Sequence, residues 1–246
     1  MPMTTAEVDT PAGHDSSALA EPRVDRLAPY DEFVMKVREA CGEPGTQQAL
    51  RRGLGKPLDE MPARTHAALL RRGLVPDSAR PTEKRAYYAV AALIAARPRT
   101  MRKADDHAME PEDAGAASGQ DEGVADPSGA DPAHTAGSET ERPTDQRPSW
   151  GTSLGTSLAQ AVTRDRPDGT RAGGIESRLH LLVRQETDGM YRMLPAIARH
   201  LGSSGVPIDY GRLLHDIAFW RYQRGETAMR WLEDFYRTIR RATRDD

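Results

Sequence analysis

Apolar residues recur every three or four positions along much of this chain, which is the period of a helix with one buried face. The spacing is clearest in the first half, in the stripe formed by Tyr30, Phe33, Val34, Val37 and Cys41. The pattern predicts four helices in this half, at residues 30–41, 47–54 and 62–70, and from Pro81 to a limit at Pro98. Proline suits the first turn of a helix, where its missing N–H breaks no hydrogen bond, so Pro62 and Pro81 fit as helix starts.

The second half of the chain continues the helical period after Trp150. We expect one helix from Ile175 and another from about Asp188, in which Pro195 predicts a kink or a late start. A third helix covers 210–220 with Asp209 as its N-cap, and a last helix follows a short basic connection. The apolar faces of these last two helices are Leu213, Leu214, Ile217, Trp220, Trp231, Leu232, Phe235, Tyr236 and Ile239.

No strand-like alternation of apolar and polar residues reaches six positions, so the predicted fold class is all-α. Residues 1–25 and 104–149 lack apolar periodicity and are rich in Ala, Pro, Asp and Ser. Such composition predicts a disordered tail and a long acidic disordered linker. The linker would join two small helical bundles, at 26–103 and 150–246.

The formal net charge of −3 conceals a sharp partition along the chain. Residues 104–145 contain twelve acids and one base, and residues 1–25 contain five acids and one base. The remainder holds 32 bases and 20 acids, and 28 of those bases are arginine. The predicted folded parts are therefore strongly basic, which favours binding of polyanions. The acidic linker is either an inert tether or an electrostatic competitor for the basic faces.

Several classes of chemistry lack support in the sequence. The single cysteine, Cys41, excludes an intramolecular disulfide. No apolar run approaches the roughly 18 residues that a membrane span needs, and no secretory signal is visible, so a cytoplasmic protein is expected. The histidines are scattered without metal-ligand spacing, and neither a Gly-rich phosphate loop nor G-x-S-x-G occurs. Glu233 and Asp234 are neighbours on a helix and point to different faces. We therefore expect no enzymatic activity, no metal and no cofactor.

The stretch from Gly205 to Arg237 is the most informative part of the chain. Its two predicted helices place aromatic residues on their inner faces and arginines on their outer faces. Because the arginine fork matches phosphate geometry, the pattern indicates a binding surface for nucleic acid. The arginines chosen as candidate contacts across the chain are Arg51, Arg52, Arg178, Arg184, Arg199, Arg221, Arg224 and Arg230.

Six motifs then follow one another in a recognisable order. They are A-L-R-R-G-L-G-K-P (49–57), R-A-Y-Y-A-V-A-A-L-I-A (85–95), S-L-G-T-S-L (153–158), I-E-S-R-L-H-L-L-V-R (175–184), V-P-I-D-Y-G-R-L-L (206–214) and R-W-L-E-D-F-Y-R (230–237). The ordered set resembles the CasB family, the small subunit of the type I-E CRISPR surveillance complex, Cascade. Thr156 stands where the family has a basic residue after S-L-G, and the acidic segment departs from the compact family pattern.

The resemblance implies a non-catalytic subunit of a ribonucleoprotein. Its implied partners are other Cascade subunits, a second copy of the chain, CRISPR RNA, and the target and displaced DNA strands. In the family, two copies brace the hybrid of guide RNA and target DNA together with the displaced strand. Arginines without a base-reading motif suit that role, because phosphate contacts position a strand while base pairing reads its sequence.

Two other classes of protein stay open at this stage. One is a stand-alone helical DNA-binding regulator, for which 209–220 is the nearest candidate recognition helix. The other is a scaffold whose basic surface binds an acidic protein. Salt-dependent binding of nucleic acid separates the scaffold from the first two, and dependence on a guide RNA separates the subunit from the regulator.

Overall fold

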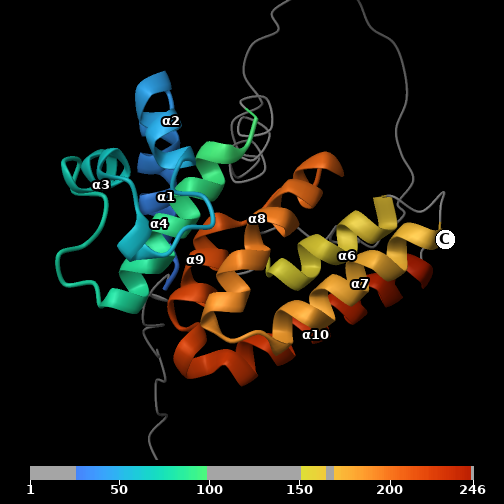
Figure 1. The fold of residues 1–246 in the computed structure, drawn as a ribbon. Helices are drawn as coiled ribbons and strands as arrows, with labels where there is room; N and C mark the ends of the chain where they lie inside the picture. The colour runs from blue at the N-terminus through green and yellow to red at the C-terminus, as the bar shows by residue number, and fades with distance from the viewer. Residues whose placement is uncertain (1–25, 99–150, 165–168, 245–246) are drawn as a thin grey trace, which may run out of the picture.

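The computed structural model describes residues 26–98, 151–164 and 169–244, with backbone alone for 169–173. Its elements are α1 (Ala28–Ala40), α2 (Pro44–Arg51), the short 3-10 helix η1 (Leu58–Glu60), α3 (Ala63–Leu70), α4 (Pro81–Ala96), α6 (Leu154–Arg164), α7 (Gly169–Arg184), α8 (Thr187–Ser203), α9 (Tyr210–Ala218) and α10 (Trp220–Arg244) (Figure 1). No strand occurs within these ranges, which confirms the all-α prediction. The predicted tail 1–25 and linker 104–149 lie outside the described residues and stay predictions.

Several helix bounds differ from the predicted ones: α1 begins at Ala28 and not at Tyr30, α2 covers Pro44–Arg51 where 47–54 was predicted, and α7 begins at Gly169 and not at Ile175. Pro62 is the N-cap of α3 and not its first residue. α8 runs from Thr187 to Ser203 with Pro195 inside it, which excludes the late start, while the kink stays a prediction. α9 ends at Ala218, and Trp220 begins α10, which replaces the expected basic connection by a helix with a kink at Gln223 (φ −121°, ψ 22°). Asp209 caps α9 as predicted, because its carboxylate accepts a hydrogen bond from the backbone N–H of Arg212 at 2.9 Å.

α6 is not among the helices that the apolar pattern predicts. Its buried face is built from small residues between two leucines, which weakens the apolar signal, although Leu154, Leu158 and Ala161 have helical spacing. The small residues have a structural reason. A Cβ on Gly155 would lie 2.9 Å from the Cα of Trp231 and closer still to its carbonyl oxygen. The backbones of α6 and α10 therefore approach more closely than any side chain at this position would allow.

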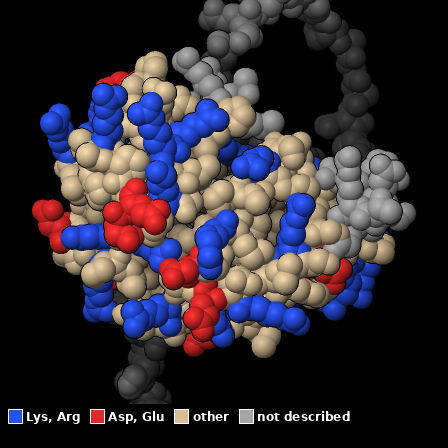
Figure 2. Space-filling model, viewed as in Figure 1, with Lys and Arg blue, Asp and Glu red and all other residues tan. Residues whose placement is uncertain are grey.

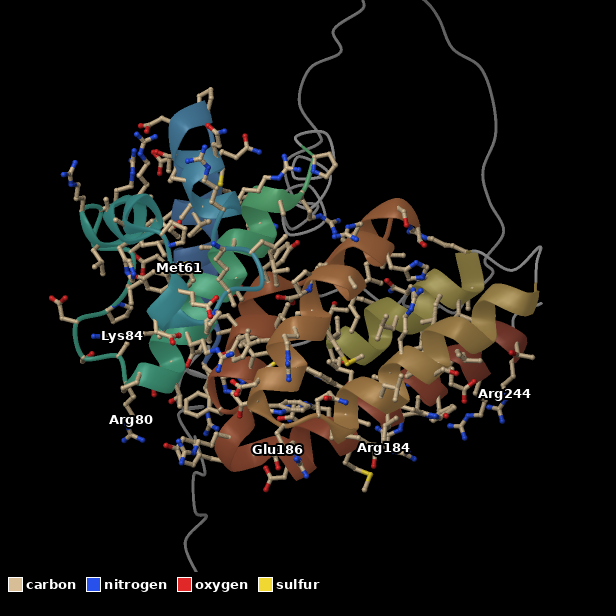
Figure 3. The ribbon with its side chains drawn as sticks, in the orientation of Figure 1. Met61, Arg80, Lys84, Arg184, Glu186 and Arg244 are labelled. Carbon is tan, nitrogen blue, oxygen red and sulfur yellow. The ribbon has the colours of Figure 1, made fainter. Side chains whose placement is uncertain are left out.

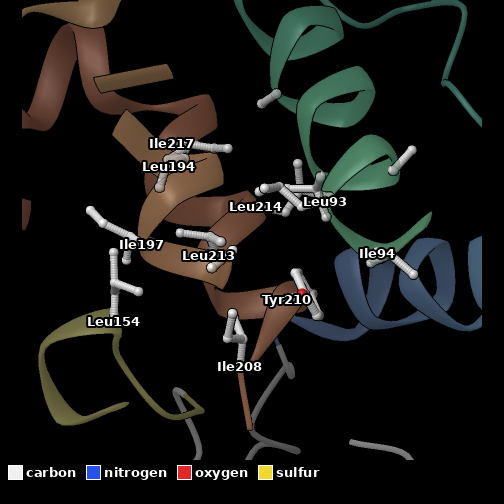
Figure 4. Packing of buried hydrophobic residues seen from close by; sticks show 14 of the residues in the cluster. Leu93, Ile94, Leu154, Leu194, Ile197, Ile208, Tyr210, Leu213, Leu214 and Ile217 are labelled. Atoms are coloured by element: carbon white, nitrogen blue, oxygen red, sulfur yellow. The ribbon is translucent and has the colours of Figure 1, made fainter. Parts of the chain in front are cut away.

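α9 lies at the centre of the hydrophobic core. Leu213, Leu214 and Ile217 of α9 are buried together with Leu93 and other residues of α4, and with residues of α6 and α8 (Figure 4). Helices from both halves of the chain thus contribute to one cluster, while the division into bundles at 26–103 and 150–246 stays a prediction. A second link joins the halves where buried Arg97, just after α4, donates to the carbonyl of Val206 at 3.2 Å.

A buried carboxylate fastens α10 to α9. Asp216 on α9 is fully buried and accepts hydrogen bonds from the indole N–H of Trp231 at 2.7 Å and from Arg230 at 2.9 Å. The Nε of Arg212, also buried, lies 3.1 Å from the same carboxylate oxygen that Arg230 contacts. The expectation of outward-facing arginines therefore fails at Arg212, since the charge of Asp216 draws it inward.

The aromatic stripe of α10 divides between core and surface. Trp220, Trp231 and Phe235 are fully buried, and the two indoles pack with ring centroids 5.1 Å apart. Tyr236, predicted on the apolar face, is instead exposed, and its hydroxyl donates to Glu176 at 2.6 Å. Because the carboxylate of Glu176 accepts this hydrogen bond, it stabilises the protonated hydroxyl and raises the pKa of Tyr236 to about 12.

We predict that Gly155→Ala destabilises the fold by about 1–3 kcal/mol or more, because the added methyl group forces α6 away from α10. Urea unfolding followed by circular dichroism measures the loss. Gly225→Ala in α10 is the matched control, since a Cβ there meets nothing within 4 Å and alanine favours helix. Equal stability of the two variants would contradict the close approach.

We predict that Asp216→Ala lowers the free energy of unfolding by about 3–5 kcal/mol, because two guanidinium groups lose their buried counter-charge. The same urea titration applies. Glu226→Ala removes an exposed carboxylate from α10 and should change stability by no more than about 0.5 kcal/mol. A loss below about 1 kcal/mol for Asp216→Ala would show that the carboxylate does not hold the two helices together.

Candidate nucleic-acid interface

A groove lies where the start of α4, the turn between α7 and α8, and the start of α10 meet. It encloses about 920 Å³ and is called groove 1 below. Five arginines, two acids and six uncharged residues line it: Pro81, Thr82, Arg85, Arg184, Gln185, Glu186, Thr187, Asp188, Gly189, Arg192, Trp220, Arg221 and Arg224. Figure 3 labels Arg184 and Glu186, which lie close together at the turn between α7 and α8.

Local packing holds the three walls of groove 1 in place. The indole N–H of Trp220 donates to the carbonyl of Gln185 at 3.3 Å, which ties the start of α10 to the α7–α8 turn. Gly189, in the first turn of α8, leaves room for the side chain of Gln185, which a Cβ there would overlap. Since Trp220 is itself in the core, the arginines on either side of the turn project from a fixed frame.

Arg85 fastens α4 to α8 across the groove. Its guanidinium forms an ion pair with Asp188 and lies over the ring of Tyr191, 4.4 Å from the ring centroid. The hydrogen bond and the charge of Arg85 hold the pKa of Asp188 below its ordinary value, while burial raises the pKa of Tyr191. Arg85 is thus engaged within the protein.

The other four arginines of groove 1 differ from Arg85 in their exposure. Arg184 ends α7, Arg192 lies on α8, and Arg221 and Arg224 lie on the first turns of α10; all four side chains are exposed. Helix ends at three different elements thereby converge on one concavity. Four exposed guanidinium groups around a groove can contact the phosphates of a strand without reading its bases.

The structure brings together three of the predicted contact residues in groove 1, namely Arg184, Arg221 and Arg224. Arg230 instead lines a second concavity of about 550 Å³, groove 2, and is held by Asp216. The remaining predicted contacts are exposed but line neither groove: Arg51, Arg52, Arg178 and Arg199.

Sequence reasoning missed Arg85 and Arg192. A signal existed for Arg192, because it follows Asp188 by four residues and so shares a helix face with that residue. No sequence signal pointed to Arg85, since its role depends on α4 lying against α8, a contact between residues about one hundred positions apart.

Lysine and arginine side chains spread across the face shown in Figure 2, whereas acidic side chains fall in fewer groups.

Across residues 26–98, 151–164 and 169–244, no group of three or more His, Cys, Asp or Glu side chains is placed to hold a metal ion. The helices of these same ranges include none that combines the length and apolar character of a membrane span. Two histidines hydrogen-bond to tyrosine hydroxyls, His66 to Tyr88 at 2.9 Å and His180 to Tyr236 at 2.8 Å.

The fold has close counterparts among solved structures. A chain of a "CRISPR RNA-guided surveillance complex" is 31% identical with a TM-score of 0.62, and the match covers 89% of this chain and 98% of that one. A chain of a "CRISPR RNA-guided surveillance complex, pre-nicking" is 32% identical, with the same TM-score and coverage. The crystal structure of M. ruber CasB shares the fold at 18% identity, with a TM-score of 0.58 over 89% of this chain and 99% of that one.

Sequence comparison points the same way. A comparison with curated proteins finds no match. The sequence profile of the CRISPR-associated protein Cse2, however, matches residues 48–236, which is most of the chain and spans both halves. Together with the structural counterparts, this match confirms the resemblance inferred from the ordered motifs, and the chain belongs to the family of the CRISPR-associated protein Cse2.

Proposed function

We propose that this protein is the non-catalytic small subunit of a type I-E Cascade complex, in which it braces the hybrid of CRISPR RNA and target DNA together with the displaced strand. The observation that carries the proposal is the convergence of Arg184, Arg192, Arg221 and Arg224 on groove 1 in a member of the Cse2 family. The similar chains whose titles name RNA-guided surveillance complexes support the assignment to such an assembly.

The energetics of strand exchange explain why such a subunit is useful. Replacing a DNA duplex by an RNA–DNA hybrid is nearly balanced in free energy, so contacts to the strand backbones can decide whether the open state persists. Arginines at exposed helix ends supply these contacts with little dependence on sequence. The sequence of the target is then recognised by base pairing with the guide RNA alone.

The packing of α9 argues against the regulator alternative. A recognition helix must expose one face to the major groove. Most of α9 is buried instead, including Leu213, Leu214 and Asp216, because α1, α4 and α10 pack around it. The helix after Asp209 therefore cannot enter DNA without breaking up the core.

The outer face of α10 supports association with protein partners as well. Met229 and Tyr236 are large, exposed and seven residues apart, which places them on one side of α10 beyond its kink, and Tyr222 is exposed just before the kink. Such exposed apolar side chains in a row are typical of contact surfaces. They suit the partner subunits, including a second copy of the chain, that the proposed assembly requires.

We predict that Arg221→Ala combined with Arg224→Ala weakens binding of target DNA by the assembled complex about tenfold, because two charge-assisted phosphate contacts are lost. A gel shift of the complex reconstituted with CRISPR RNA measures the affinity, and thermal unfolding checks that the variant is folded. The control is Arg64→Ala with Arg71→Ala, which removes the same charge from exposed positions on and next to α3. Equal affinities of the two double variants would contradict the role of groove 1.

Purification of the tagged protein distinguishes a Cascade subunit from a stand-alone DNA-binding regulator. If the tagged full chain is purified from its host, a Cascade subunit should bring processed CRISPR RNA and other protein subunits with it. A stand-alone regulator should bring neither, and its DNA binding should need no guide RNA.

A further inference from the structure

Both ends of the acidic stretch between α4 and α6 are held next to one loop of the fold. This stretch lies within 99–150, which the structure does not describe. On its N-terminal side, buried Arg97 donates to the carbonyl of Val206 at 3.2 Å. On its C-terminal side, the backbone N–H of Thr152 donates to the carboxylate of Asp209 at 2.8 Å. At most about 11 Å of chain separates Val206 from Asp209, so the connection between the two halves has no long distance to span.

The length and the charge of this stretch therefore exceed what a connection requires. Residues 104–145, called the acidic segment below, contain twelve acids and one base. A carboxylate presents two oxygens to a guanidinium group, as a phosphate does, and so it can occupy the same arginines. The chain thus carries its own polyanion, covalently attached to a strongly basic fold.

Groove 1 has the excess of positive charge that such a ligand needs. Five arginines line it together with only two acids, Glu186 and Asp188, and five cations less two anions leaves a net charge of +3. Asp188 is already engaged, because Arg85 binds it and the charge of Arg192 also holds its pKa below the ordinary value. The exposed arginines around the groove therefore favour an acidic ligand.

Groove 2 lies closer to the point where the stretch ends, since Gly151 lines it, but its charges balance. Four arginines and four acids line this groove or contact its lining: Arg212, Arg230, Arg237, Arg241, Asp209, Asp216, Glu233 and Asp234. An acidic ligand gains little electrostatic energy in such surroundings. Of the two grooves, groove 1 is the one that suits the acidic segment.

The length of the acidic segment matches the distance to groove 1. Groove 1 begins at Pro81 and Thr82, while the anchored Arg97 follows the other end of α4. The sixteen residues of α4 separate these points by about 24 Å along the helix axis. The centre of 99–150 is about 26 residues from either anchor, and a disordered chain of that length, as its composition predicts, spans about 28 Å. An attached ligand binds best when its typical span equals the distance to its site.

We propose that groove 1 binds the acidic segment of its own chain when no nucleic acid occupies the groove. The inference rests on the proposed function, because the same arginines then exchange carboxylates of the chain for phosphates of a strand. A ligand attached by a linker acts at an effective concentration in the millimolar range, so weak ion pairs are sufficient.

The consequence is a selection between ligands. Nucleic acid bound non-specifically, with dissociation constants of roughly 10⁻⁴–10⁻⁶ M, has to compete with the acidic segment. A strand held in the complex by base pairing to the guide RNA is already present at the groove and replaces the segment there.

Zero-length crosslinking of the isolated full chain tests the contact directly. A carbodiimide joins a carboxylate to an amine that touches it, and no lysine lines groove 1. Arg221→Lys places an amine in the groove, and Arg71→Lys places one at an exposed position next to α3 as the control. Crosslinks from 104–145, identified by mass spectrometry, should be about five- to tenfold more abundant at position 221 than at position 71.

Higher salt and added nucleic acid complete the crosslinking test. Crosslinks to position 221 should decrease at about 500 mM salt and on addition of a 20-nucleotide single-stranded DNA. Equal yields at positions 221 and 71, with equal reactivity of the two lysines toward an acetylating ester, would overturn the proposal.

Neutralising the acidic segment tests its effect on binding. Replacing each Asp by Asn and each Glu by Gln within 104–145 keeps the length of the chain. This variant should bind the 20-nucleotide DNA about three- to tenfold more tightly at about 50 mM salt, as measured by fluorescence anisotropy. In a background of Arg221→Ala with Arg224→Ala the gain should fall below about twofold, whereas the Arg64→Ala with Arg71→Ala background should retain it. An equal gain in both backgrounds would show a general effect of net charge and contradict binding at groove 1.

The gel shift of the reconstituted complex keeps this proposal apart from the proposed function. Crosslinking at position 221 together with full target affinity of the Arg221→Ala, Arg224→Ala complex would leave the segment contact standing and remove the strand contact. Weakened target binding in that complex without preferential crosslinking would do the reverse.

Discussion

The buried carboxylate of Asp216 is the contact on which the arrangement of the C-terminal helices depends. It lies on α9, the most enclosed helix of the fold, and receives the indole of Trp231 and the guanidinium of Arg230 from α10. An isolated charge in such a place is highly unfavourable, so its donors have to stay within reach. α10 is thereby held in one position against α9, while Gly155 lets α6 pack against its backbone.

That constraint determines what the arginines can do. Arg85, Arg97 and Arg212 are drawn into the structure by a carboxylate or a carbonyl. Arg85 and Arg97 join elements that are distant in the chain, whereas Arg212 pairs with Asp216 on the same helix. Others, such as Arg221 and Arg224, project from the fixed helix into groove 1. The strongly basic folded part is thus divided between residues that hold the fold and residues that face a ligand. The proposed role in bracing strands requires only the second group, presented on a rigid frame.

The sequence predicted the helices well where large apolar residues mark one face, as in α1, α4 and α9. It failed at α6, because the requirement there is for a small residue against the α10 backbone, and this requirement is visible only once the two helices are placed together. The ordered motifs were enough to identify the family. At the candidate site, the exposure of Arg221 and Arg224 could be predicted, because both lie in the basic stretch between the apolar faces of the last two predicted helices. The contact between Arg85 and Asp188 joins residues about one hundred positions apart, which spacing alone does not reveal, whereas Arg212 pairs with Asp216 four residues further along the same helix.

The most direct measurement for this account is a cryo-electron microscopy structure of the assembled complex with CRISPR RNA and a target DNA. The account predicts that strand phosphates lie within hydrogen-bond distance of Arg221 or Arg224 at groove 1, with α10 in the position that Asp216 imposes. It would be contradicted if groove 1 faced solvent or another protein subunit while the strands passed over a different surface of the molecule.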